Sequence, residues 1–202
     1  MQKTIAKIIS VIFNPLIMPT LGILILFNSN SYYSMLPYEA KRVIFLTVLI
    51  STCLLPLSFL PLFLYQKLIK SISMDSNRER IVPFIVVSIM YIMTYFLLKR
   101  MGVPTQINNL ILGGSFTIFL LALISVKWKI SAHMAGVGAL LGALFIFSFQ
   151  TQTSFLVYLI LTIFISGLLG TSRIKLNKHT ARQIYVGFAV GLVAIVSTFL
   201  IF

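Results

Sequence analysis

The sequence contains little charge, almost no acid and a single cysteine. Of 202 residues, 9% are charged, and the only acids are Glu39, Asp75 and Glu79. A soluble domain is typically about 25% charged and a disordered chain has low hydrophobicity, so the 59% hydrophobic content excludes both classes. Cys53 has no partner for an intrachain disulfide. An integral membrane protein is the class that fits.

Seven apolar runs are long enough to cross a bilayer as helices. A crossing helix needs about 20 mostly apolar residues, and no run contains Lys, Arg, Asp or Glu away from its ends. The runs are continuous rather than alternating, which favours helices over a β-barrel. We expect an all-α, polytopic transmembrane helix bundle of six to seven spans, forming one domain over 1–202, with apolar runs at 5–27, 43–65, 81–98, 108–126, 133–150, 154–170 and 183–202.

The number of spans depends on the first run, which Asn14, Pro15 and Pro19 interrupt. A bilayer tolerates a proline break only where neighbouring groups bind the freed carbonyls. Residues 5–27 are therefore expected to form either a kinked crossing or a re-entrant segment. In the fifth and last runs, small residues recur at every fourth position, which favours close helix packing over a ligand surface; they are Ala135, Gly138, Ala139, Gly142, Ala143, Gly187 and Gly191.

Positive charge is concentrated on one expected face of the membrane. The chain carries 16 Lys and Arg and a formal net charge of +13. With seven crossings, all but Lys41, Arg42, Lys99 and Arg100 share the face of the N-terminus. In a soluble protein this excess would indicate nucleic acid, but cations scattered between apolar runs argue against that partner. Either the positive-inside rule or an anion site formed by converging basic loops explains the asymmetry.

The only two histidines, His133 and His179, lie on this basic face in different loops. Ser131 is expected to cap the helix that follows it, and the free N–H groups at a helix start favour anions. His133 is then adjacent to an expected oxyanion site. The alternative is an ordinary capped helix with a histidine at the level of the lipid headgroups.

Around His179 the sequence combines cations with a hydrogen-bonding amide. Arg173 supplies a planar guanidinium suited to phosphate oxygens. The amide oxygen of Gln183 can accept the proton of one His179 nitrogen, which leaves the other nitrogen free to attack. If the last helix begins one turn early, Lys175, His179 and Gln183 share one helix face.

The spacing of these residues resembles the signature of the type 2 phosphatidic acid phosphatase superfamily. Segment 172–183 reads Ser-Arg, five residues, His, three residues and Gln, and it is similar to the third motif, which ends in Asp. Segment 131–133, Ser-Ala-His, resembles the end of the second motif, Pro-Ser-Gly-His. Segment 80–83, Arg-Ile-Val-Pro, is similar to the first motif, which ends in Arg-Pro. The resemblance covers about residues 66–183.

The resemblance implies a phosphatase-like core over about 66–202, preceded by N-terminal spans over about 5–65. It implies a metal-independent, cofactor-free hydrolase of a lipid phosphate or diphosphate, such as an isoprenyl diphosphate, a phosphatidate-type lipid or lipid A. It also implies that His179 attacks phosphorus to form a phosphohistidine, that His133 protonates the leaving oxygen and that Gln183 orients His179. The residues implied to bind phosphate are Arg173, Arg80, Arg78, Ser131 and Lys129.

The departures from the family pattern keep a second function open. Gln183 replaces the family's Asp, Ala132 replaces Gly, and Ser73 stands where the first motif has Lys. Asp75 or Glu79 could supply the missing carboxylate, and Lys70 or Lys129 the missing lysine. The alternative is a catalytically weakened or inactive member that binds anionic lipid or a membrane partner. A transporter or channel is disfavoured because the spans contain no internal ionisable residue.

The resemblance also bears on location. Many members of the family act on the outer side of the plasma membrane, so we expect a multi-pass protein of the cell (inner) membrane with its site on the extracytoplasmic face. The count of cations decides neither side, because the basic loops are the same loops that carry the motifs. The oligomeric state is left open.

Overall fold

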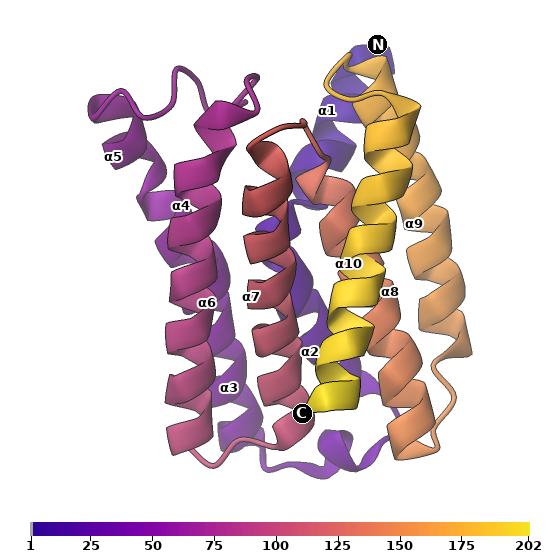
Figure 1. The fold of residues 1–202 in the computed structure, drawn as a ribbon. Coiled ribbons are helices and arrows are strands. Elements are labelled where there is room, and N and C mark those ends of the chain that lie inside the picture. The colour runs from indigo at the N-terminus through magenta and orange to yellow at the C-terminus, as the bar shows by residue number, and fades with distance from the viewer. Residues whose placement is uncertain (1) are drawn as a thin grey trace.

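The computed structural model describes residues 2–202, and every regular element in that range is a helix. Figure 1 shows the helices running alongside one another between two ends of a bundle. This confirms the all-α polytopic bundle. Seven segments are long and apolar enough to cross a membrane, namely Lys3–Asn28, Tyr38–Tyr65, Arg78–Arg100, Thr105–Ser125, Ala132–Thr151, Leu156–Lys175 and Ala181–Ile201.

The first span is a kinked crossing rather than a re-entrant segment. It consists of α1 (Gln2–Ile12), a 3-10 helix η1 (Pro15–Ile17) and α2 (Met18–Asn28). Figure 1 shows α1 near one end of the bundle and α2 continuing toward the other. Asn14, which precedes the proline, is extended at φ −62° and ψ 135°, and its side chain accepts a hydrogen bond from the Leu16 N–H. The kink follows from the backbone restriction that proline imposes on the residue before it.

The second span is also interrupted by proline. It consists of α3 (Tyr38–Leu49), a π-helix η3 (Ile50–Leu54), α4 (Leu55–Ser58) and α5 (Leu60–Tyr65). The Tyr91 hydroxyl donates to the carbonyl of Thr52 at 3.2 Å. Tyr91 is 1% exposed, so a buried side chain from another span satisfies backbone in the distorted turn.

The remaining spans are regular helices. They are α6 (Ile81–Arg100), which follows the short η4 (Arg78–Arg80), then α7 (Thr105–Ser125), α8 (Ala132–Thr151), α9 (Leu156–Lys175) and α10 (Ala181–Ile201). Packing is most extensive between α8 and α10. A methyl group at Gly138 would collide with the Phe188 carbonyl, and one at Gly191 with the Ala135 carbonyl. The predicted close packing of small residues is confirmed, because only glycine permits this approach.

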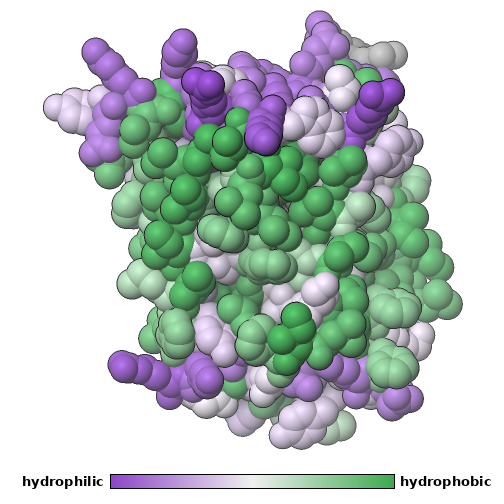
Figure 2. All heavy atoms as spheres, viewed as in Figure 1, coloured by the Kyte–Doolittle hydropathy of each residue, from purple (hydrophilic) through white to green (hydrophobic). Residues whose placement is uncertain are grey.

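Polar residues gather at the two ends of the bundle, and Figure 2 shows an apolar band between them. The start of α1 and the loops at 66–77, 126–131 and 176–180 lie at one end, with the C-terminus at the other (Figure 1). The topology therefore brings the three basic loops to the face where the chain begins. The short η2 (Tyr32–Met35) belongs to the opposite face.

Two helix boundaries beside the third motif-like segment differ from those predicted. Helix α9 extends to Lys175, five residues beyond the predicted end at 170, and carries Arg173 in its last turn. Helix α10 begins at Ala181, with Thr180 as its N-cap, so His179 lies in the preceding loop. The expectation that Lys175, His179 and Gln183 share one helix face is therefore wrong. Lys175 is the last residue of α9 and is exposed.

Candidate active site

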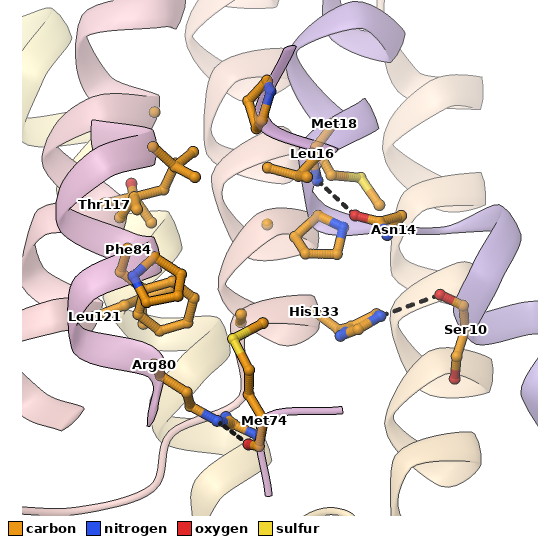
Figure 3. Close-up of a pocket in the computed structure, with 18 of the residues that line it drawn as sticks. Ser10, Asn14, Leu16, Met18, Met74, Arg80, Phe84, Thr117, Leu121 and His133 are labelled. Carbon is orange, nitrogen blue, oxygen red and sulfur yellow. Dashed lines mark hydrogen bonds between the residues drawn. The ribbon is translucent and has the colours of Figure 1, made fainter. Parts of the chain in front are cut away.

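A cavity of about 500 Å³ lies between the first two spans and helices α6, α7 and α8. This volume is within the range of small-molecule sites, about 300–1,000 Å³. Figure 3 shows Arg80, His133 and Ser10 near one end, with Leu16, Met18 and Thr117 farther along. The end of the cavity nearest the basic loops is lined by ionisable and hydroxyl side chains. They are Lys7, Ser10, Ser73, Arg80, His133, Arg173, Lys178 and His179.

His179 is held by Gln183 in a defined tautomer. Its Nδ1 lies 3.0 Å from Gln183 Oε1, and the same oxygen accepts the backbone N–H of Thr180 at 3.2 Å. The second bond belongs to the capping box of α10. Because a backbone N–H can only donate, Gln183 must present its oxygen, and Nδ1 must carry the ring proton. This leaves Nε2 of His179 unprotonated.

The surroundings of His179 keep its ring neutral. The side chain is 7% exposed. Burial is the main cause that lowers the pKa of His179 to about 3, and repulsion from Arg80 and Arg173 contributes to this lowering, while the hydrogen bond to Gln183 opposes it. At physiological pH the imidazole is therefore uncharged with a free Nε2, which is the form that a nucleophile requires.

Gln183→Glu should shift the pH dependence of any reaction at His179. Glutamate keeps the length of the side chain and both hydrogen bonds but adds a negative charge beside the imidazole. Such a charge favours the imidazolium form and raises a histidine pKa by about 1–3 units. For such a reaction the acid limb of kcat/KM is expected near the His179 pKa of about 3 in the wild type, and it should move upward by a similar amount in the variant.

The measurement is a pH–rate profile of the purified protein in detergent, with Gln183→Leu as the variant that lacks an acceptor. In Gln183→Leu we expect lower turnover, because the ring loses its orienting partner. An acid limb that stays in place in Gln183→Glu would contradict the assignment of His179 as the titrating group.

His133 lies in the first turn of α8. Ser131 caps this helix, as predicted, and its hydroxyl oxygen accepts the Met134 N–H at 3.4 Å. His133 Nε2 lies 3.1 Å from the carbonyl oxygen of Ser10 in α1 (Figure 3). A carbonyl only accepts, so Nε2 carries the proton and Nδ1 is the unprotonated nitrogen. The two histidines of the site thus have opposite neutral tautomers.

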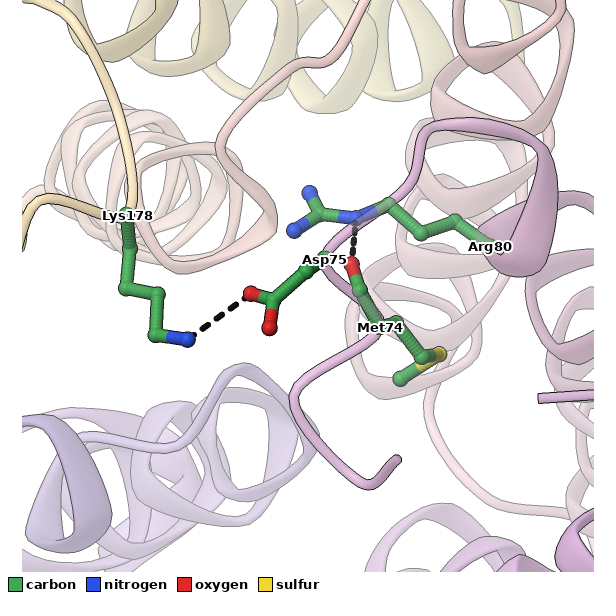
Figure 4. A network of polar contacts seen from close by, with 4 residues as sticks. All are labelled: Met74, Asp75, Arg80 and Lys178. Atoms are coloured by element: carbon green, nitrogen blue, oxygen red, sulfur yellow. Dashed lines mark hydrogen bonds and ion pairs between the residues drawn. The ribbon is translucent and has the colours of Figure 1, made fainter. Parts of the chain in front are cut away.

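Arg80 is 5% exposed and joins two loops at the site. Its Nε donates to the Met74 carbonyl at 2.9 Å (Figure 4), and its Nη1 donates to the Ile130 carbonyl at 2.8 Å. These bonds tie the segments that precede α6 and α8 to one guanidinium. Further N–H groups of the same guanidinium are left over for a ligand, because arginine has more donors than these two bonds use.

Arg173, in the last turn of α9, is half-buried and lines the same cavity. Its Nε is buried and has no hydrogen-bond partner among residues 2–202. Within that range the ion pairs join Glu39 to Arg42 and Asp75 to Lys178, and neither involves Arg80 or Arg173. A buried cation without a counter-charge is destabilising. The two arginines therefore form a site that an anion would stabilise.

The other predicted phosphate ligands are less well placed. Arg78 is exposed and does not line the cavity, so Arg80 is the arginine of segment 78–83 that reaches it. Ser131 is fully buried, and its oxygen serves as the helix cap. Lys129 is half-buried near the arginines, and burial, followed by repulsion from Arg80, lowers its pKa.

Asp75 does not replace the missing carboxylate beside His179. Its Oδ1 lies 2.7 Å from Lys178 Nζ (Figure 4), and the hydrogen bond from this lysine lowers the pKa of the Asp75 carboxyl. Asp75 is exposed, so the pair lies at the surface, on the loop before α6 and the loop after α9. The hydrogen-bond partner of His179 is the neutral Gln183.

The motif-like residues lie within 66–183, so the contribution of the first span to the site was not predicted. Lys7, Ser10 and Asn14 all line the cavity. The available signal was the Asn14-Pro15 break near the basic face, where a bilayer helix must find partners for its freed carbonyls. Lys178 was also missed, although it directly precedes His179 in the third motif-like segment.

Beyond these polar groups, the cavity wall is apolar. The described residues contain no cluster of three His, Cys, Asp or Glu that could hold a metal ion. The combination of cationic groups with an apolar wall suits a ligand that has an anionic head and an aliphatic part. The residues that form this wall include Leu57, Phe84, Val87, Leu110, Ile118 and Ile195.

Comparisons of this chain with models of known protein families, with curated proteins and with solved structures find no match.

Proposed function

We propose that this chain is a membrane-embedded lipid phosphatase of the type 2 phosphatidic acid phosphatase kind, acting on a lipid phosphate or diphosphate. One observation carries the proposal. Arg80 and Arg173, neither of them paired with a carboxylate among residues 2–202, line the same cavity as a buried His179 whose Nε2 is free. Unneutralised guanidinium groups next to a neutral imidazole are suited to a phosphate group under nucleophilic attack.

In the proposed reaction, His179 Nε2 attacks phosphorus while the bond from phosphorus to the lipid oxygen breaks. His133 acts from its imidazolium form, which takes up a proton at Nδ1 from water as the phosphate binds. The lipid oxygen takes this Nδ1 proton and leaves as an alcohol, or as a lipid monophosphate when the substrate is a diphosphate. Water then attacks the phosphohistidine, His133 accepts a proton from the water, and inorganic phosphate leaves. Arg80 and Arg173 neutralise charge on the phosphoryl oxygens in both steps.

The bound phosphate also favours the acid form of His133. A phosphate monoester brings negative charge beside this ring, and an adjacent opposite charge favours imidazolium over imidazole. The apolar wall formed by residues such as Phe84 and Leu110 receives the aliphatic part of the substrate. We further infer that the site faces the extracytoplasmic side of the inner membrane, as the family resemblance implies.

The test is phosphate release by the purified protein in detergent from a panel of isoprenyl diphosphates, phosphatidates and phosphorylated lipid A. We expect turnover on at least one member and an unchanged rate after addition of EDTA. Intact cells that produce the protein should hydrolyse a short-chain, membrane-impermeant lipid phosphate, which would be protected if the site were cytoplasmic. Dependence on a divalent metal would contradict the proposed chemistry.

The alternative is a catalytically inactive member that binds anionic lipid, and the neutral Gln183 beside His179 favours it. This alternative predicts that lipid phosphates co-purify with the protein and protect it from thermal unfolding but are never hydrolysed. Absence of turnover across the whole panel, together with such protection, would replace the phosphatase proposal with this one.

A further inference from the structure

The break in the first span leaves a backbone carbonyl free next to the site. The last backbone hydrogen bond of α1 runs from the Phe13 N–H to the Ile9 carbonyl at 3.0 Å. The next N–H in the helical series, that of Asn14, is displaced because Asn14 is extended before Pro15. The carbonyl of Ser10 is therefore the first one at the break that has lost its helical partner.

His133 is the group that satisfies this carbonyl. Its Nε2–H donates to the Ser10 oxygen at 3.1 Å, across 123 residues of sequence. Ser10 itself is 6% exposed. A freed carbonyl inside a membrane protein needs such a donor, so the bond stabilises the kink. The same bond determines which nitrogen of His133 carries the proton.

A second contact holds the break against the same helix. Gly136 lies three residues after His133, so both lie on one side of α8. A Cβ atom at Gly136 would be 3.1 Å from both Cα and Cβ of Pro15, which is closer than most real contacts. The absence of a side chain at Gly136 thus lets η1 pack directly on α8. The kinked span and α8 are therefore joined at two points, one turn apart along α8.

We propose that the Asn14-Pro15 break positions His133. The break presents the Ser10 carbonyl to the imidazole, and this contact orients the ring so that Nδ1 is available to the leaving oxygen. The inference rests on the proposed phosphatase function for its catalytic consequence. A hydrogen-bond acceptor on one imidazole nitrogen sets the tautomer and ring orientation and stabilises the protonated ring. Here the acceptor comes from an N-terminal span outside the segment that carries the motif-like residues.

The first test measures the tautomers directly and needs no activity. The chain contains only two histidines, so ¹⁵N-histidine labelling gives a spectrum of two rings, assigned with a His179→Asn variant. We expect His133 to be protonated at Nε2 and His179 at Nδ1. In the double variant Asn14→Ala/Pro15→Ala, a continuous helix returns the residue-14 N–H to the Ser10 carbonyl, and the His133 signals should change to a mixture of tautomers.

The second test separates positioning from a general loss of structure. An alkyl phosphate needs its leaving oxygen protonated, whereas a para-nitrophenyl phosphate with the same alkyl chain does not. General acid catalysis contributes about 10²–10⁴-fold. The double variant and Gly136→Ala should therefore slow hydrolysis of dodecyl phosphate at least about 10²-fold. The first-turnover burst of para-nitrophenol, which reports attack by His179 before water reacts, should change by less than about threefold. Pro61→Ala, at an exposed proline outside the cavity, is the control and should alter neither rate.

The outcomes are distinguishable. If the wild type hydrolyses neither these esters nor any member of the lipid panel, the proposed function fails, and the tautomers of His133 still test the structural part of the inference. If the wild type hydrolyses both esters and the double variant slows dodecyl phosphate and the para-nitrophenol burst equally, the break is structural only, and the inference is overturned. Protonation of wild-type His133 at Nδ1 would also overturn it.

Discussion

Replacing His179 with alanine should abolish phosphate release, with a loss of about 10⁴-fold or more in kcat. The reason is that His179 is the proposed nucleophile, with its Nε2 free beside Arg80 and Arg173, while the other histidine of the cavity, His133, is assigned to proton transfer. Losing the nucleophile of a covalent mechanism removes most of the rate enhancement, and the other parts of the site cannot restore it. The measurement is steady-state phosphate release, combined with trapping of ³²P-labelled protein by an alkaline quench, which preserves phosphohistidine.

The matched comparison is the only other histidine, His133. His133→Ala should slow hydrolysis of an alkyl phosphate by about 10²–10⁴-fold, as expected for loss of a general acid. It should still allow labelling of the protein by an aryl phosphate, because that leaving group departs without a proton. A ³²P-labelled adduct that persists in His179→Ala would identify a different nucleophile and refute this assignment.

Replacing Arg173 with alanine should reduce kcat/KM by about 10²–10³-fold, the usual effect of removing one preorganised donor from a developing oxyanion. The buried Nε of Arg173 has no partner among residues 2–202, so it is free to donate to phosphate. Arg173→Lys should restore little of this loss, because an ammonium group lacks the planar, multi-donor geometry of guanidinium. The measurement is kcat and KM on the best substrate of the lipid panel.

Arg182→Ala provides the control for charge. Arg182 lies in the first turn of α10, is exposed and does not line the cavity, so its replacement removes the same net charge from the same face. We expect less than about a threefold change. Equal losses in Arg173→Ala and Arg182→Ala would mean that the basic face attracts substrate only through its overall charge.

The role of Gln183 became clear only in the structure. In the sequence, the residue is a departure from a pattern that ends in Asp. In the structure, its Oε1 accepts from both His179 Nδ1 and the Thr180 N–H, so one atom caps α10 and sets the histidine tautomer. An amide is sufficient for orientation, while the charge that would stabilise imidazolium is absent. The predicted interaction between Gln183 and His179 is present, although the predicted helix start is not.

The sequence by itself determined the class of the protein and its spans. Apolar runs of about 20 residues and the near absence of acid follow directly from the solvent that a bilayer provides, and all seven runs are helical. Ser131 as a helix cap was equally predictable, because capping depends on residues within one turn. Counting the seven predicted crossings along the sequence also placed both histidines on the same face of the membrane.

Only the tertiary structure decided which groups meet at the site. It selected Arg80 over Arg78, paired Asp75 with Lys178, and brought Ser10 from the first span to His133, 123 residues away. None of these contacts leaves a periodic trace in the sequence, since each depends on how separate helices pack and where their kinks point. The Asn14-Pro15 break was visible from the beginning. What it does next to His133 follows from the packing of η1 on α8, because a freed carbonyl bonds to whichever donor the neighbouring helix presents.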